Sequence, residues 1–263
     1  MDAPRLVATD LDGTIVRSDG TISDRTRLAL AAVERSGAVL VLVTGRPPRW
    51  MAPIVEATGH RGVAICANGA LVYDLHTSSV VRHDLLTADA IRAVVAALRR
   101  DAPGIAFAVE CHDTGFAHEP SYRPRWDGAD PKAVRPLEEL YDDGVVKLLA
   151  RHDGMNADEL LAAAHASVGG LASLTHSSSD GLLEISAAGV SKASGLASLA
   201  DEHGIAASDV LAFGDMPNDL PMLAWAGWGV AVANAHPEVL AAADEVTSSN
   251  DDDGVAEVLD RWF

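Results

Sequence analysis

Two short acidic stretches of the sequence each come directly after an apolar run. The first is DLDGT at residues 10–14, which follows residues 6–9, and the second is GDMPND at residues 214–219, which follows residues 210–213. Short apolar runs of this kind are typical of buried parallel strands. Because the carboxyl ends of such strands form the ligand crevice of an open α/β sheet, we expect the two stretches to meet there.

The four acidic side chains of these stretches that could share a ligand are Asp10, Asp12, Asp215 and Asp219. Carboxylates crowded together repel one another, and some would be forced to protonate. A divalent cation removes this repulsion, and Mg²⁺ suits an all-oxygen ligand set that leaves room for water and a phosphate group. The alternative is two independent turns, in which each Asp bonds nearby backbone amides.

Two further stretches contain groups that bind phosphate. Thr44 and Gly45 follow the apolar run at residues 38–43, where a hydroxyl and a backbone amide can hold phosphate oxygens, although Thr-Gly after a strand is also an ordinary turn. Lys192 lies at the start of a predicted helix, where the helix dipole disfavours a cation. A phosphate shared with the helix start would reverse that preference; the alternative is a solvated surface lysine.

The composition limits the partners of the protein. Its 263 residues carry a formal net charge of -18, which argues against nucleic acid and anionic membranes as partners. No apolar run approaches the roughly 20 residues of a membrane span, and no signal-peptide pattern precedes residues 6–8. Cys66 and Cys111 lie apart in apolar surroundings, which indicates two buried reduced thiols. We expect a soluble, cytoplasmic protein.

The N-terminal part of the chain alternates between strand and helix patterns. Apolar runs at residues 6–9, 38–43 and 63–66 predict buried strands. Ser23 and Gly37 mark the ends of a first helix, and a Pro-Pro pair opens a second. The second helix is expected to carry on one face Trp50, Met51, Ile54 and Val55. This alternation predicts a Rossmann-like, doubly wound parallel sheet with helices on both faces.

The pattern changes near Asn68, and the alternation returns from Ser191 onward. The part between contains a predicted hairpin, two capped helices and several strands, and a Pro-rich stretch at residues 119–136 that is expected to be mostly irregular. Such a mixture indicates an inserted α+β domain of roughly a hundred residues. We predict a core formed by residues 1–83 and 190–263, interrupted by an inserted domain at residues 84–189.

Taken together, these motifs resemble those of haloacid dehalogenase-type phosphatases. DLDGT, TGR at residues 44–46, a helix-borne Lys192 and GDxxND occur in the order typical of that family. Further signatures resemble its Cof-type subgroup, in which an α/β cap is inserted between the second and third motifs: NGA at residues 68–70, VANA at 232–235 and NDDDGV at 250–255. The departures, Met216-Pro217 and Ala233, do not involve the expected catalytic residues.

The resemblance implies a role for each matching residue. Asp10 is expected to be the nucleophile, and Asp12 the general acid and then the general base. Mg²⁺ is expected to be held by Asp10, the Asp12 carbonyl and Asp215, with help from Asp219. The expected phosphate-binding residues are Thr44, Gly45, Lys192 and Asn218. Further candidates for substrate contact are Arg46, Asn68 and Gly69 in the core and Arg123, Lys147 and Glu184 in the inserted domain, where a solvated surface role is the alternative.

The function that the resemblance implies is Mg²⁺-dependent hydrolysis of a small phosphate ester through an aspartyl-phosphate intermediate on Asp10. A sugar phosphate or a phosphorylated cofactor is the expected substrate. Two other functions are compatible with the same residues: a sugar phosphomutase or phosphotransferase on this scaffold, and a non-catalytic binding protein that retains the fold. The sequence names neither the substrate nor the oligomeric state.

Overall fold

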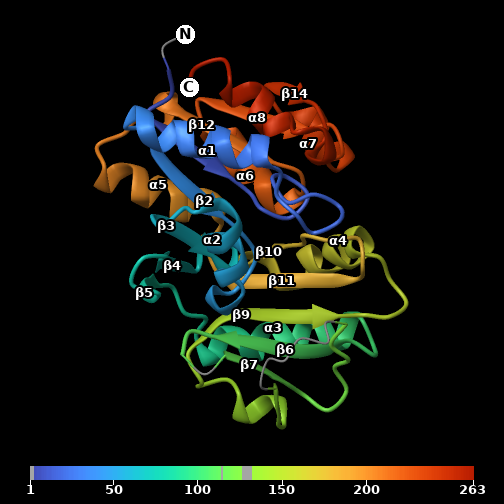
Figure 1. Cartoon of the computed structure of the whole chain (residues 1–263). Helices are drawn as coiled ribbons and strands as arrows, with labels where there is room; N and C mark the ends of the chain where they lie inside the picture. The colour runs from blue at the N-terminus through green and yellow to red at the C-terminus, as the bar shows by residue number, and fades with distance from the viewer. Residues whose placement is uncertain (1–2, 114, 126–131) are drawn as a thin grey trace. The chain divides into compact units, whose positions relative to one another are not determined.

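A computed structural model of the chain describes residues 3–113, 115–125 and 132–263. The chain divides into two compact units (Figure 1). The first unit comprises Met1–Arg82 and Ser191–Phe263, and the second comprises His83–Val190. Among the described residues, no helix combines the length and the apolar character that a membrane span requires.

The first unit is built on an eight-stranded sheet. Its strands are β1 (Leu6–Thr9), β2 (Val39–Val43), β3 (Val63–Cys66), β4 (Leu71–Asp74), β5 (Ser79–His83), β12 (Val210–Gly214), β13 (Trp228–Val232) and β14 (Glu245–Thr247). They lie in the order β14-β13-β12-β1-β2-β3-β4-β5. Neighbouring strands are parallel from β14 to β3, and β4 runs antiparallel to β3.

The centre of this sheet brings together two segments that are far apart in the sequence. The chain leaves β1 toward β2 and β3 on one side, and later returns to place β12, β13 and β14 on the other. The direction of winding therefore changes between β1 and β12, which pair in parallel with Thr9 opposite Phe213. In open α/β sheets, such a switch point leaves a crevice at the carboxyl ends of the two strands.

The helices of the first unit are α1 (Asp24–Ser36), α2 (Ala52–Thr58), α5 (Lys192–Glu202), α6 (Leu220–Trp225), α7 (Pro237–Ala242) and α8 (Gly254–Leu259). Its 3₁₀ turns are η1 (Pro48–Trp50), η2 (Ala67–Gly69), η5 (Ala207–Asp209), η6 (Pro217–Asp219) and η7 (Asn250–Asp252). Helix α1 packs with α2 and α8, while α5 packs with α6. The predicted α/β fold class, with a parallel sheet and packed helices, is confirmed.

The predicted second helix is shorter than expected. Residues Pro48–Trp50 form only a 3₁₀ turn, Met51 precedes the helix, and α2 begins at Ala52. Pro53 explains the difference, because its ring lacks an N–H and would clash with the carbonyl of the fourth residue before it in a continuous helix. Met51, the N-cap of α2, is buried like Ile54, as expected, whereas Trp50 lies outside α2 in the 3₁₀ turn.

The second unit has a six-stranded sheet in the order β10-β11-β9-β6-β7-β8. Its strands are β6 (Ala106–Cys111), β7 (Gly115–His118), β8 (Lys132–Val134), β9 (Val145–Arg151), β10 (Ala172–Thr175) and β11 (Leu182–Ala187). Its helices are α3 (Ala88–Asp101) and α4 (Ala157–Val168), with 3₁₀ turns η3 (Leu137–Glu139) and η4 (Gly169–Leu171). All pairs are antiparallel except β7 with β8.

One face of this second sheet is covered by α3 and α4, which contact each other. The apolar core beneath them includes Phe107 on β6, Leu148 on β9 and Ile185 on β11. The described part of the stretch at residues 119–136 is mostly irregular, as expected, apart from strand β8, which pairs with β7. Residues 126–131 of that stretch lie outside the described residues.

Candidate active site

Three buried carboxylates converge at the switch point of the first sheet. Asp10 directly follows β1, and its backbone N–H donates to the Phe213 carbonyl of β12 at 3.0 Å. One carboxylate oxygen from each of Asp10, Asp215 and Asp219 lies within 4.8 Å of the others. All three residues are buried. A close, oxygen-only set of this kind fits a hard divalent cation such as Mg²⁺, so the residues present suit the predicted metal.

A buried ammonium group balances part of this negative charge. The Lys192 Nζ donates to Asp10 Oδ1 at 2.5 Å and to Asp219 Oδ1 at 2.7 Å. Lys192 is only 1% exposed, so the alternative of a solvated surface lysine is wrong. It is the first residue of α5, where the helix dipole disfavours a cation. The two carboxylates offset that cost.

Burial and mutual repulsion shift the pKa values of this cluster. Burial, with the charge of Asp219, raises the pKa of Asp215 to about 7, although Lys192 opposes the shift. Burial also raises the pKa of Asp10 well above its ordinary value, with Lys192 again opposing. Burial alone would lower the pKa of Lys192, but Asp10 and Asp219 raise it overall. Without a cation, Asp10 and Asp215 therefore tend to share a proton near neutral pH.

The turn after β1 fits closely against Asp215. Gly13 has a φ of +82°, and a Cβ placed on it would lie 2.3 Å from Asp215 Oδ2. Thr14 donates its hydroxyl to Asp215 Oδ1 at 3.0 Å. Gly13 is therefore required both for its left-handed conformation and for space. The contact of Thr14 with Asp215 was not predicted, although Thr14 belongs to the DLDGT stretch.

Asp219 differs from the other two carboxylates because both of its oxygens already accept hydrogen bonds. Its Oδ2 accepts from the backbone N–H groups of Asp215 and Met216, at 3.0 and 3.1 Å. Its Oδ1 accepts from Lys192. Asp219 thus holds the turn after β12 in shape and fixes the ammonium group. This arrangement leaves Asp10 and Asp215 as the members better placed to offer oxygens to a ligand.

The side chain of Asp12 lies apart from the three clustered carboxylates. It is 56% exposed, and Arg46 holds it in a two-point fork, with Nε 2.7 Å from Oδ2 and Nη2 2.5 Å from Oδ1. The expectation that four carboxylates crowd together is therefore correct for three of them. The intervening Leu11 is fully buried, and Asp12 turns outward after it. Only the backbone carbonyl of Asp12 remains as its predicted metal contact.

The phosphate-binding candidates lie at neighbouring strand ends of the same unit. Thr44 follows β2, is buried, and its hydroxyl accepts from the Arg46 N–H at 3.0 Å, with Gly45 between them. Asn218 lies in the turn after β12, and its Nδ2 donates to Asn68 Oδ1 at 3.1 Å. The Oδ1 of Asn218 is buried without a hydrogen-bond partner. The pairing of Asn68 with Asn218 was not predicted.

The three candidates of the second unit differ in burial. Lys147 on β9 and Glu184 on β11 form a buried ion pair, with Nζ 2.9 Å from Oε1, so neither is a solvated surface residue. Arg123 is exposed. Near this ion pair, the buried Tyr122 ring lies 5.8 Å from the Arg151 guanidinium, a contact that the sequence did not indicate. The alternate spacing of Lys147 and Arg151 along β9 would have indicated a shared face.

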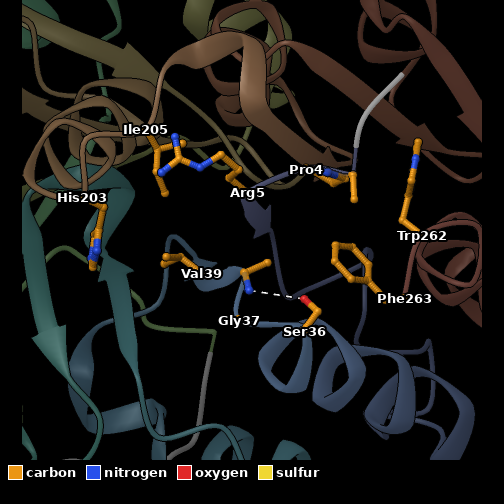
Figure 2. A pocket seen from close by; sticks show the side chains of 11 residues that line it. Pro4, Arg5, Ser36, Gly37, Val39, His203, Ile205, Trp262 and Phe263 are labelled. Carbon is orange, nitrogen blue, oxygen red and sulfur yellow. Dashed lines mark hydrogen bonds between the residues drawn. The ribbon is translucent and has the colours of Figure 1, made fainter.

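A pocket of about 390 Å³ lies beside the amino ends of β1 and β2, and Figure 2 shows the side chains that line it. Arg5, which precedes β1, and Val39, which begins β2, both line it, together with His203, Trp262 and Phe263. Arg5 and Val39 mark the amino ends of β1 and β2, whereas Asp10 and Asp215 follow the carboxyl ends of β1 and β12. None of the residues that line this pocket is acidic, so it is distinct from the carboxylate cluster.

Comparisons with known proteins point to one family. The profile of the haloacid dehalogenase-like hydrolases matches residues 7–259. The 5-amino-6-(5-phospho-D-ribitylamino)uracil phosphatase YcsE of Bacillus subtilis is 29% identical over 98% of this chain and 95% of its own. The pyridoxal phosphate phosphatase YbhA of Escherichia coli is 29% identical over 97% of each chain. The structure of BT1666, a phosphatase from Bacteroides thetaiotaomicron, matches with a TM-score of 0.81 and 27% identity over 98% and 95% of the two chains.

We predict that the metal-free protein is less stable at pH 8.5 than at pH 6. The folded-state pKa of Asp215, about 7, lies above its ordinary value of 3.8. The folded protein therefore binds the proton more tightly than the unfolded chain, and this stabilisation is lost as the pH rises through 7. We expect a difference of about 1 kcal/mol in the free energy of unfolding, measured by denaturant titration in a chelator.

The matched variant Asp215→Asn should weaken this pH dependence, because it removes one of the two carboxyl groups whose pKa is raised; Asp10 remains. Saturating Mg²⁺ should also flatten it, since a cation competes with the proton for the same oxygens. Equal or greater stability of the metal-free wild type at pH 8.5 would contradict the predicted proton on the cluster.

Proposed function

The chain belongs to the haloacid dehalogenase-like hydrolase family, and on that premise we propose that it is a Mg²⁺-dependent phosphatase of small phosphorylated metabolites that acts through an aspartyl phosphate on Asp10. The family profile covers residues 7–259, so the resemblance and the predicted hydrolase class are confirmed. The observation that carries the finer proposal is the buried cluster of Asp10, Lys192, Asp215 and Asp219 at the switch point of the sheet.

The proposed reaction has two steps. A carboxylate oxygen of Asp10 attacks phosphorus and forms an acyl phosphate, while the bond to the leaving oxygen breaks and Asp12 gives that oxygen its proton. Asp12 then takes a proton from water, and the resulting hydroxide attacks phosphorus, which releases phosphate and restores the Asp10 carboxylate. The exposure of Asp12 supports this role, because its carboxylate is open to solvent water once Arg46 releases it.

The other core residues would hold the phosphoryl group and its charge. Lys192 supplies a fixed positive charge beside Asp10, and Thr44, Gly45 and Asn218 supply hydroxyl and amide groups at adjoining strand ends. Asp10, Asp215 and the Asp12 carbonyl would hold Mg²⁺, with Asp219 assisting. When bound, the ion neutralises charge on the phosphoryl oxygens, which is the main requirement of phosphoryl transfer. The fork from Arg46 keeps Asp12 oriented until a substrate arrives.

The substrate class follows from the relatives and from the inserted unit. Two relatives are named for phosphatase activity on small molecules, a phosphoribitylamino-uracil and pyridoxal phosphate. We propose a similar soluble ester, such as a sugar phosphate or a phosphorylated cofactor, and a cytoplasmic enzyme. All the motif residues belong to the first unit. We therefore assign the choice of substrate to residues 83–190, acting as a cap domain, and the chemistry to the rest of the chain.

The two alternatives differ from this proposal in measurable ways. A phosphomutase or phosphotransferase would need a sugar acceptor or a bisphosphate, whereas a phosphatase releases free phosphate into water alone. A binding protein would show no turnover. A panel of phosphorylated metabolites incubated with Mg²⁺ and scored for free phosphate separates all three.

We predict that Asp10→Asn abolishes turnover while leaving the protein folded. Loss of the nucleophilic carboxylate removes the covalent step, and residual positioning should leave less than about a thousandth of the wild-type rate. The surface substitution Asp209→Asn in the same unit is the matched control and should retain full activity. A rate above that limit for Asp10→Asn, in a preparation free of wild-type protein, would exclude Asp10 as the nucleophile.

We predict that activity requires Mg²⁺, that a chelator abolishes it, and that excess Ca²⁺ inhibits it. Ca²⁺ takes more oxygen ligands at longer distances than Mg²⁺ and would displace Asp10 from its attacking position. Phosphate release is measured after chelation and after each ion is returned separately. Full activity in chelator, or equal rates with the two ions, would be evidence against a magnesium site.

We predict that changes in the second unit alter KM and the ranking of substrates without stopping the chemistry. Glu184→Gln removes a buried ionic contact of Lys147, and breaking such a pair is destabilising. The double variant Lys147→Met with Glu184→Gln removes both charges together and is the better test. Arg123→Ala changes an exposed residue and should leave stability unchanged.

Each variant is assayed on the metabolite panel and on p-nitrophenyl phosphate, a substrate with no natural leaving group to recognise. The ranking should change while p-nitrophenyl phosphate is still cleaved. If instead hydrolysis of every substrate fell together with the ranking unchanged, the inserted unit would belong to the catalytic machinery.

A further inference from the structure

The segment after β3, η2 (Ala67–Gly69), has an unusual backbone for its residue types. Ala67, Asn68 and Gly69 have φ angles of 50°, 58° and 103° in succession. A left-handed conformation costs non-glycine residues roughly 1–2 kcal/mol each, although Asn tolerates it better than most. Two such residues in a row persist only where surrounding contacts hold them. The segment is also buried.

The contacts that hold this segment come from residues placed above in the phosphate site. The backbone N–H of Asn68 donates to the Thr44 carbonyl, and that of Ala67 donates to the Arg46 carbonyl, each at 3.0 Å. These two bonds tie η2 to the loop that carries Thr44 and Gly45. These hydrogen bonds to the loop hold Ala67 and Asn68 in their left-handed conformation.

The start of helix α5 packs against the same segment. A Cβ added to Gly69 would lie 2.0 Å from the Ser191 carbonyl oxygen and 3.2 Å from the Lys192 backbone nitrogen. A side chain at residue 69 would therefore move the residue that precedes Lys192. Since Lys192 Nζ contacts both Asp10 and Asp219, the close fit at Gly69 helps to fix the ammonium group.

The side chain of Asn68 reaches a third part of the site. Its Oδ1 accepts from Asn218 Nδ2 at 3.1 Å, across 150 residues of sequence. The opposite end of the Asn218 amide is buried without a hydrogen-bond partner. Asn68 therefore binds the N–H end of the Asn218 amide, and the oxygen end of that amide has no partner.

From these contacts we infer that Asn68 is a positioning residue, which orients the Asn218 amide toward the phosphoryl group and does not itself contact the substrate. This inference rests on the proposed phosphatase function. An amide suits the task because it can donate to or accept from its partner. In the structure the free end of the Asn218 amide is its oxygen, whereas a phosphoryl oxygen needs a donor. Binding phosphate therefore requires both amides to turn over, so that Asn218 Nδ2 donates to the phosphoryl oxygen and Asn68 Nδ2 donates to Asn218 Oδ1. An Asp at residue 68 could only accept, and would favour the orientation that presents the Asn218 oxygen to the phosphate.

The test is a double-mutant cycle between residues 68 and 218. Asn68→Gly removes the side chain at a position where glycine adopts the backbone without strain, so the variant should fold. We expect a loss of about tenfold to a hundredfold in kcat/KM, the size typical of residues that orient a ligand-binding group. The loss should shrink to near zero in the Asn218→Ala background, because Asn68 then has nothing to position.

A second variant keeps the shape of the side chain. Asn68→Asp tolerates the same backbone and still accepts from Asn218, so a purely structural role predicts little change in phosphate binding. We expect weaker binding of inorganic phosphate in the presence of Mg²⁺, measured by calorimetry, and no further weakening when Asn218 is already Ala. A direct charge effect of Asp would instead persist in that background. The exposed Ser78, which also has a positive φ of 53°, provides the control Ser78→Gly.

The outcomes separate this inference from the function on which it rests. A wild-type protein that neither hydrolyses esters nor binds phosphate with Mg²⁺ would refute the proposed function. An active wild type whose Asn68→Gly and Asn68→Asp variants keep normal kcat/KM and phosphate affinity would refute the positioning role alone. Losses at residues 68 and 218 that multiply independently would also refute it, since Asn68 would then act without Asn218.

Discussion

The arrangement of the first unit depends on one constraint, which is that several charges must be buried together without a net excess of one sign. Three carboxylates lie within 4.8 Å of one another, and taking such groups out of water is costly unless they are paired. Lys192 supplies one positive charge directly. Burial, together with the remaining negative charge, raises the pKa values of Asp10 and Asp215, and the negative charge makes the cluster receptive to a cation.

Sheet topology makes this burial achievable with short side chains. The pairing of β1 with β12 brings the residues that follow both strands to the same edge, so Asp10 and Asp215 meet without long reaches. Close packing then excludes other arrangements: Gly13 leaves space for Asp215, and Gly69 leaves space for Ser191. Gly13 and Gly69 therefore help to fix the positions of the charged side chains as well as the path of the backbone.

The sequence predicted the strands and the meeting of their acidic ends, because apolar runs and strand-end carboxylates are local patterns. It did not settle whether Lys192 is buried, since its partner Asp10 lies 182 residues away. A separation of 150 residues likewise hid the pairing of Asn68 with Asn218. It also overlooked the effect of Pro53 on α2, and β14, which has only three residues and no alternating pattern. Long-range side-chain partners follow from tertiary packing, which no short stretch of sequence encodes.

Lys192 follows a long insertion in the sequence, yet its ammonium group lies beside Asp10. Contacts within the first unit, at both ends of the insertion, hold it there. Arg82, at the end of β5, donates to Ser198 at 2.6 Å and to Glu202 at 3.0 Å, both on α5, and Gly69 packs against Ser191. Because these contacts fix α5 within the first unit, the length and sequence of the insertion can vary at little thermodynamic cost. Under the proposed function, the residues that would bind phosphate are thereby kept independent of those that would select the substrate.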